Sequence, residues 1–318
     1  MSVPPGERPL AQHRAARDRR LLRIGIGALA FLAITGLAIG ASLGSGTPEA
    51  GPVAGAEPPA PVVAEALPAP RVESVDAVAP CENDAVLGAL QAGDPGAVVA
   101  AFGGAQAFRA HVTAGSAPCI PLDDARWPWV VVNKQRPLAP AEFRPASIAS
   151  PVNVAIQDRA LQADAAQALD RLTAAAEAEG AGRIALNSGF RSYETQISSF
   201  GAQVQSRGVE AAEEVSARPG HSEHQTGLAA DVVACDGSSC GTLGDFGATG
   251  QGAWTAQNAW RFGWIVRYEA GATGTTGYAA EPWHLRYIGP ELAEAYHAGG
   301  YHTLEEFFGL PPAPDYVH

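Results

Sequence analysis

The sequence predicts an α+β fold in which helices flank a small antiparallel sheet. Four short runs rich in apolar residues predict strands, at positions 183–188, 228–233, 264–268 and 281–289. Helical patterns lie between these runs and the connections are short, which favours a mixed α+β arrangement. Histidines and carboxylates gather in and beside two of the predicted strands, which indicates a metal site on the sheet.

The N-terminal region predicts a membrane anchor. Positions 1–20 are a basic tail, and through Arg23 there are six arginines against Glu7 and Asp18. Positions 21–43 are almost wholly apolar, and about 20 such residues suffice to cross a bilayer as a helix. The arginines predict a cytoplasmic tail, with the rest of the chain outside the cell membrane. A signal peptide, secreted after cleavage, is the alternative, although its apolar region is usually only ~7–15 residues long.

Three further regions follow the anchor. Positions 44–80 are rich in Pro, Ala and Gly without apolar periodicity, which predicts a disordered linker. Positions 81–126 carry two short apolar runs and predict a small helical region before the main domain, called the preface below. It contains no candidate functional residues. Positions 127–311 predict one folded domain, followed by a C-terminal tail at 312–318.

Within the domain the elements can be placed in order. A β-branched strand with a polar turn is expected at 128–137. The alanine-rich segment 153–180 has an apolar residue, such as Ile156 or Leu169, at helical spacing and predicts a long helix. The remaining predicted helices are 193–207, 254–262, 290–297 and 303–308.

Charge and cysteine content restrict the possible partners. The formal net charge is −12 although the N-terminal arm is basic, so the exported part is more acidic still. Nucleic acid is therefore excluded as a partner, because phosphate binding needs clustered Lys and Arg. Cys81 with Cys119, and Cys235 with Cys240, predict two local disulfides in an oxidising compartment. A cysteine-only zinc site is the alternative, but paired C-x₂-C spacing is missing.

Four residues predict a metal site with a general base beside it. His224, Asp231 and His284 are a nitrogen and oxygen ligand set that suits Zn²⁺, and three protein ligands leave a fourth position for water. Glu281, three residues before a ligand, is then placed to take a proton from that water. A surface loop with solvated histidines is the alternative for one histidine alone, and it explains the whole set poorly.

The spacing of these residues is compatible with a sheet. In a strand at 228–233, alternation sends Asp231 to the face opposite Leu228 and Val232. Gly227 allows the loop that carries His224 to turn sharply back onto this strand. In the strand at 281–289, His284 shares one face with Arg286. Two neighbouring strands and one loop can therefore present three ligands to one ion.

Three sequence blocks resemble a known family. SGFRSYETQ (188–196), GHSEHQTGLAAD (220–231) and EPWHLRYIG (281–289) are similar to the signature blocks of VanY-type zinc D-alanyl-D-alanine carboxypeptidases, and VNKQRPL (132–138) resembles the entry segment of that group. The wider family includes D-Ala-D-Ala dipeptidases and L-alanyl-D-glutamate endolysins. The resemblance covers positions 127–311. An acidic, Gly-rich insert at 235–252 departs from the pattern near the site.

The resemblance implies a role for each matched residue. It implies the same three ligands, with Glu281 as the base that later protonates the leaving amine. Arg191 would stabilise the oxyanion that forms on the peptide carbonyl, although a surface salt bridge is an alternative for this residue. Substrate contacts are implied for Ser222, Gln196, Arg218, Trp283 and Tyr278, while bracing, solvation or packing are the alternatives for these five.

The expected function is zinc-dependent hydrolysis of the C-terminal D-alanine peptide bond of peptidoglycan stem peptides. An endopeptidase or dipeptidase with the same metal site is one alternative. A non-catalytic wall-binding module with a structural zinc is another, but structural sites are normally closed by four protein ligands. The expected partners are peptidoglycan stem peptides and, through the N-terminal helix, the membrane.

Overall fold

A computed structural model describes residues 79–157 and 159–317. The predicted basic tail, the apolar segment 21–43 and all but the end of the predicted linker lie outside these residues. Within the described part, no helix is both long and apolar enough to cross a membrane. The membrane segment therefore stays a prediction.

The described chain begins with three short helices, α1 (Asp84–Ala92), α2 (Pro95–Ala101) and α3 (Ala105–Thr113). The side chains of Asn83 and Asp94 accept hydrogen bonds from backbone N–H groups two and three residues later, and so cap α1 and α2. Apolar side chains of all three helices share one core with residues of the sheet and of the C-terminal helices. The preface is therefore packed onto the rest of the described chain.

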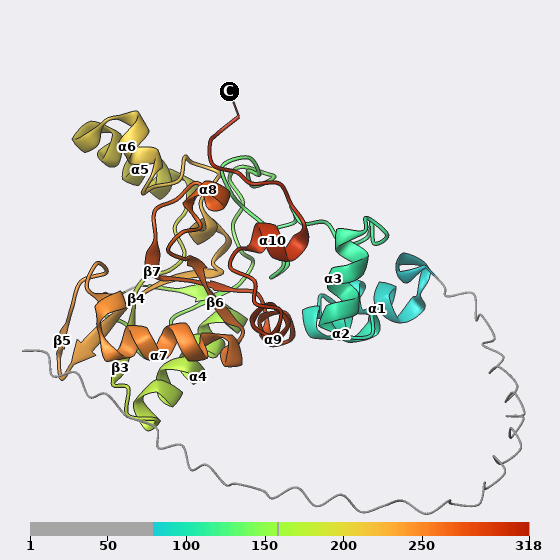
Figure 1. Cartoon of the computed structure of the whole chain (residues 1–318), viewed down its shortest axis with the longest axis horizontal. Helices are drawn as coiled ribbons and strands as arrows, with labels where there is room; N and C mark the ends of the chain where they lie inside the picture. Colours follow the sequence, from blue (N-terminus) through green and yellow to red (C-terminus); the bar gives the residue numbers. More distant parts are fainter. Residues whose placement is uncertain (1–78, 158, 318) are drawn as a thin grey trace, which may run out of the picture. The chain divides into compact units, whose positions relative to one another are not determined.

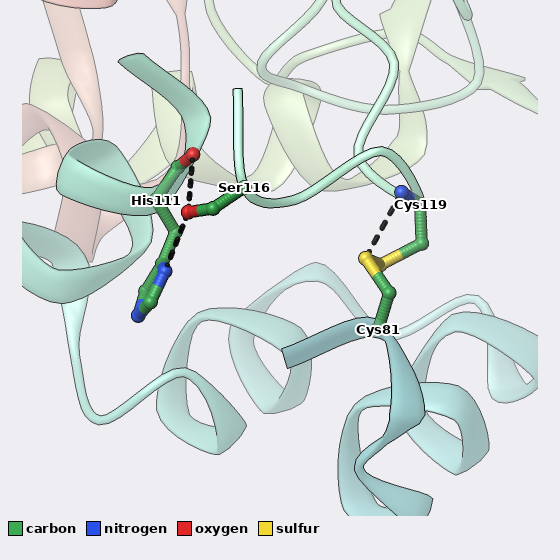
Figure 2. The surroundings of a disulfide bond; sticks show 4 residues. All are labelled: Cys81, His111, Ser116 and Cys119. Atoms are coloured by element: carbon green, nitrogen blue, oxygen red, sulfur yellow. Dashed lines mark hydrogen bonds between the residues drawn. A yellow bond between two sulfur atoms is a disulfide. The ribbon is translucent and has the colours of Figure 1, made fainter. Parts of the chain in front are cut away.

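A disulfide ties the start of the preface to the loop that follows α3. Figure 2 shows Cys81 of the 3-10 helix η1 (Pro80–Glu82) bonded to Cys119, as predicted. Beside this bond, the hydroxyl of Ser116 donates to the carbonyl of His111. The cross-link spans 38 positions, and closing a loop of this size stabilises a fold by roughly 3–4 kcal/mol.

The main sheet is antiparallel with strand order β3-β4-β7-β6 (Figure 1). These strands are β3 (Arg183–Ser188), β4 (Ala229–Asp236), β6 (Trp264–Tyr268) and β7 (Glu281–Tyr287), and β5 (Ser239–Cys240) pairs with the end of β4. β4 is central, because it pairs with β3 on one side and β7 on the other. The predicted α+β class and antiparallel sheet are confirmed.

One face of this sheet is covered by the helix α4 (Ala163–Ala178). Leu169 of α4 lies in one core with Leu186, Val232 and Leu285 of three neighbouring strands, and all four side chains are 0% exposed. Burying such a side chain contributes about 1.5–3 kcal/mol. Because side chains alternate along each strand, the neighbours of these residues point to the opposite face.

The helix predicted at 153–180 begins only at Ala163, so its first third is a wrong prediction. Residues 153–155 lie beside β3 instead, where Asn153 and Ala155 exchange backbone hydrogen bonds with Leu186. β2 (Leu161–Gln162) pairs with the short strand before it. Ile156, which fitted the helical stripe, is 43% exposed. Pairing with the sheet edge has overridden local helix propensity here.

The strand predicted at 128–137 is also wrong, since this segment forms only one isolated bridge. The carbonyls of Pro128 and Val130 accept hydrogen bonds from the guanidinium group of Arg286 at 3.0 and 2.8 Å. A buried carbonyl needs one partner, and here a side chain supplies it in place of a neighbouring strand.

The remaining elements are β1 (Ile148–Ala149), α5 (Tyr193–Arg207), α6 (Val209–Glu213), η2 (Glu223–Thr226), η3 (Phe246–Ala248), α7 (Gly250–Asn258), η4 (Ala259–Phe262), α8 (Thr273–Thr276), α9 (Pro290–Ala298) and α10 (Leu304–Phe308). Of these, α5, α7 with η4, α9 and α10 lie where the sequence predicts helices, whereas the other short elements were not predicted. The second predicted disulfide is present, between Cys235 and Cys240 at paired positions of β4 and β5.

Candidate active site

Strand register brings two of the predicted ligands together. Asp231 on β4 lies opposite Ser188 of β3 and opposite His284 of β7. Residues that face each other across antiparallel strands have Cβ atoms about 4.5–5.5 Å apart. The carboxylate and the imidazole therefore meet on one face of the sheet, as the alternation predicts.

The third predicted ligand comes from a tight loop. His224 lies in η2, which ends at Gly227 with φ +72°, a left-handed conformation that favours glycine. A Cβ at Gly227 would lie 3.1 Å from the backbone nitrogen of Gln162, so the close packing of the loop also requires glycine. The loop therefore turns back onto β4, as the sequence indicates.

Hydrogen bonds orient the imidazole of His224. Its Nδ1 lies 2.8 Å from the carbonyl oxygen of Gly189 and donates to it, since a carbonyl can only accept. Nε2 then carries the lone pair in the neutral ring, and it lies 3.2 Å from Oδ2 of Asp231. A ligand held by its second ring nitrogen in this way has a fixed tautomer and ring orientation.

The imidazole of His284 is held on both sides. Nδ1 lies 3.1 Å from Oδ1 of Asp231, and Nε2 lies 3.3 Å from Oε2 of Glu223. The ring of Tyr268 covers it with centroids 4.8 Å apart. Burial alone would lower the pKa of His284, but the neighbouring carboxylates of Asp231 and Glu223 outweigh burial and raise it to about 9.

The residues present fit a zinc ion. One donor atom each from His224, Asp231 and His284 lies within 4.8 Å of the other two. Among the described residues, Oδ1 of Asp231 is buried without a hydrogen-bond partner, although Nδ1 of His284 is only 3.1 Å away. The donor atoms therefore face one another without good hydrogen-bond geometry. Two imidazoles and one carboxylate are a ligand set that suits Zn²⁺.

Glu281 lies at the edge of this group. Its Oε2 is 3.6 Å from Nδ1 of His284, and its side chain is 16% exposed. Burial, supported by the charge of Asp231 and opposed by His284, raises the pKa of Glu281 to about 7. A carboxylate with a pKa near neutrality can both accept and return a proton at physiological pH.

Arg191 follows directly after the end of β3 and reaches the same place. Its guanidinium donates to Oε1 of Gln196 at 2.9 Å and to Oγ of Ser188 at 3.2 Å. Burial lowers the pKa of Arg191, while the charges of Asp231 and Glu281 oppose that change. An arginine remains charged under these conditions, so a fixed positive charge lies beside the three donors.

These groups share one cleft of about 780 Å³. Ser222, Trp283 and Tyr278, which were predicted to contact substrate, line this cleft together with Glu281, Arg191 and the three metal-binding candidates. A cleft of this size is large enough for a short peptide.

Two other predicted substrate contacts have different surroundings. Gln196 is 0% exposed, and its amide nitrogen donates to the carbonyl of Ala217 at 2.7 Å. It therefore holds Arg191 in place from behind the cleft. Arg218 is paired with Glu213 at 2.6 Å, and its guanidinium lies over the ring of Tyr316. Neither residue lines the cleft, and their substrate roles stay predictions.

The cleft residues that were not singled out from the sequence include Glu223, Tyr268 and Arg159. Glu223 stands between two motif residues, and this position beside a ligand was a usable signal. Tyr268 lies in a correctly predicted strand, where an aromatic residue alone gives no specific signal of function. Arg159 lines the cleft and donates to the carbonyl of Asn187 at 3.1 Å, but it lies outside the recognisable blocks and had no signal.

Comparisons with known proteins agree with this geometry. The family model described as VanY, D-alanyl-D-alanine carboxypeptidase, matches residues 158–290. YodJ of Bacillus subtilis is 39% identical over 184 residues, which cover 56% of this chain and 66% of YodJ. A D-alanyl-D-alanine carboxypeptidase of Enterococcus faecalis is 33% identical over 201 residues, covering 58% of this chain and 67% of that protein.

A solved structure is also similar. The LD-carboxypeptidase LdcB superposes with a TM-score of 0.52 at 37% sequence identity, over 57% of this chain and 86% of that chain.

Proposed function

The chain belongs to the VanY family of D-alanyl-D-alanine carboxypeptidases, and from this premise we propose that it removes the C-terminal D-alanine of peptidoglycan stem peptides in a zinc-dependent reaction. The observation that carries the proposal is the convergence of three metal-binding candidates, Glu281 and Arg191 in one cleft. A binding module would not need a buried carboxylate with a pKa near 7 at that point.

His224, Asp231 and His284 would hold the zinc ion. Nε2 of His224, the carboxylate of Asp231 and Nδ1 of His284 are the donor atoms that face one another. Zinc in such a site supplies Lewis acidity, which makes water a usable nucleophile near neutral pH.

Glu281 moves the protons. It accepts a proton from the attacking water and returns it to the amine of the departing D-alanine. Its carboxylate is close to the metal-binding group, at 3.6 Å from Nδ1 of His284, and remains partly open to the cleft. Burial favours its protonated form, which makes the second transfer possible at physiological pH.

Arg191 stabilises the negative charge that develops on the carbonyl oxygen of the cleaved bond. Its guanidinium is fixed in advance by Gln196 and Ser188, so little reorganisation is needed when the charge appears. Donors placed in this way typically contribute roughly 2.7–4 kcal/mol to transition-state stabilisation. Ser222, Trp283 and Tyr278 line the same cleft and would contact the substrate.

One observation favours a second candidate function. The similar structure LdcB, at 37% identity, is named an LD-carboxypeptidase. Such an enzyme removes D-alanine from a preceding L-configured centre, whereas the D-Ala-D-Ala activity removes it from another D-alanine. The zinc site and Glu281 serve both reactions equally.

The experiment that tests the proposal uses the zinc-loaded full chain in detergent. It is incubated separately with stem pentapeptides ending in D-Ala-D-Ala and with tetrapeptides ending in one D-alanine, and product masses are recorded. Loss of one alanine from the pentapeptide supports the main proposal, and loss from the tetrapeptide alone supports the second. Cleavage of neither peptide would contradict both.

We also propose that positions 21–43 anchor the enzyme in the cell membrane with the catalytic domain outside. The support is the apolar length of this segment and the arginines that precede it. Protease added to intact spheroplasts should release a soluble fragment that begins within positions 44–80. Protection of the domain from protease would show that the orientation is wrong.

A further inference from the structure

Four charged side chains form a buried network behind the cleft. They are Glu223 of η2, Arg267 of β6, Arg286 of β7 and Glu305 of α10, and each is at most 2% exposed. Arg267 donates to Glu223 at 2.9 Å and to both oxygens of Glu305 at 2.8 and 3.0 Å. Arg286 donates to the same oxygen of Glu223 at 2.9 Å.

The network is neutral and fully bonded. Two arginines balance two glutamates. Nη2 of Arg286 donates to two backbone carbonyls, and Asn133 donates to Glu305 at 2.9 Å. Burial would raise the pKa of Glu223, but Arg267 and Arg286 outweigh burial and hold it well below its usual range. Glu223 is therefore a carboxylate that both arginines fix in position.

Only one oxygen of Glu223 is used within the network. Oε1 accepts from both arginines, while Oε2 points away from them and lies 3.3 Å from Nε2 of His284. The remaining members of the network make no bond to the three metal-binding candidates among the hydrogen bonds of the described residues.

We propose that Glu223 is the positioning residue for the metal ligand His284. Its Oε2 accepts a hydrogen bond from the N–H group at Nε2 of His284. This bond keeps the lone pair on Nδ1 and turns that atom toward Asp231 and the metal position. This inference rests on the proposed zinc site. The arginine pair acts through Glu223, because it sets both the charge and the direction of the carboxylate.

The placement argues for a positioning role over a purely structural one. A buried ion network is often no more stabilising than apolar side chains of similar volume, so stability alone explains it poorly. A carboxylate that accepts from the second nitrogen of a metal-bound histidine typically improves metal affinity by about 10–100-fold. Glu223 has this geometry, and Glu305 in the same network does not.

Two matched variants test the proposal. Glu223→Gln and Glu305→Gln each remove one negative charge from the same buried network, but only Glu223 touches His284. Zinc affinity is measured by competition with a chelator, and thermal midpoints of the metal-free proteins report folding. Both variants should lose stability, whereas Glu223→Gln alone should weaken zinc binding by about 10–100-fold.

Equal zinc affinity in the two variants would overturn the proposal. If the wild-type chain itself binds no zinc and cleaves no stem peptide, the proposed function fails. If the wild-type chain binds zinc and cleaves while Glu223→Gln binds zinc equally well, only the positioning role fails.

A measurement on the wild-type chain decides the matter should Glu223→Gln not fold. In the zinc-loaded protein, NMR of the histidine ring nitrogens should show Nδ1 of His284 bound to metal and a slowly exchanging proton on Nε2. A proton on Nδ1, with the metal at Nε2, would leave nothing for Glu223 to accept and would overturn the proposal.

Discussion

Two buried polar groups lie side by side in this protein and differ in how completely they are bonded. The cleft cluster consists of His224, Asp231, Glu281 and His284; the buried network consists of the two arginines and two glutamates described above. In the buried network the charges cancel and every charged group has hydrogen-bond partners. In the cleft cluster two carboxylates share two imidazoles, and Oδ1 of Asp231 has no hydrogen-bond partner.

This difference in bonding matches a difference in role, since one group keeps a fixed charge and the other can exchange protons. Full pairing keeps the pKa of Glu223 far below neutrality, so that its charge is constant across physiological pH. Burial, which the nearby His284 and Arg191 offset only in part, raises the pKa of Glu281 to about 7, where a carboxylate can transfer protons. A hydrogen bond between Glu223 and His284 links the two groups, and through it the rigid group orients the reactive one.

The largest effect should follow from removing a metal-binding candidate from the cleft cluster. His284→Ala takes away one of three protein ligands, so we expect loss of both zinc and activity. Metal content by atomic spectroscopy and turnover of a stem peptide are measured on the same sample. An active, zinc-loaded His284→Ala protein would remove this residue from the site.

Arg191→Ala should leave zinc bound and lower kcat by about 10²–10³-fold, because it removes a donor that acts mainly on the developing negative charge. Steady-state kinetics on a stem peptide check this, with zinc content as the control. A change in KM alone would instead assign Arg191 to ground-state binding.

The pH dependence of stability should distinguish the two groups in the metal-free protein. The pKa of His284 is raised to about 9 and that of Glu281 to about 7. A raised pKa means that folding favours the protonated form. Stability from Glu281 is therefore lost as pH rises through 7, and stability from His284 as pH rises through 9.

We therefore expect the free energy of unfolding of the metal-free protein to fall by a few kcal/mol between about pH 5 and pH 9.5. The buried network contributes no change in this window, since the lowered pKa of Glu223 affects stability only in acid. Denaturant titrations at several pH values measure the curve. His284→Gln should flatten its alkaline half, and a flat wild-type curve would contradict the assignment.

The smallest effect should come from Arg218→Ala. This side chain is 34% exposed and already paired with Glu213 outside the cleft. We expect it to cost less than about 1 kcal/mol of stability, as is usual for ion pairs near the surface. Arg218→Ala should lower kcat/KM less than Arg191→Ala does. A loss larger than that of Arg191→Ala would support the substrate contact predicted for Arg218 from the sequence.

The sequence predicted those parts of the fold and site that depend on local pattern. Strand alternation placed Asp231 and His284 on one face, and Gly227 indicated the turn that carries His224. The buried network escaped prediction because its members come from four distant elements. The segment at 128–137 was misjudged for a related reason, since Arg286 bonds its carbonyls from far along the chain.

Gln196 shows the same limit at a single residue. On a helix it looked like a solvated group or a substrate contact, yet it is fully buried and holds Arg191. Local sequence pattern reveals which residues can do chemistry. It reveals less about which residues hold them, because that depends on the tertiary packing.

The central claim is that Glu281 transfers protons while three other residues hold the metal. Zinc content and stem-peptide turnover of Glu281→Gln, measured beside the wild-type chain, test it most directly. The variant should keep zinc near full occupancy while turnover falls by at least about 10²–10⁴-fold. Loss of zinc would make Glu281 a ligand, and retained turnover with zinc bound would contradict the mechanism.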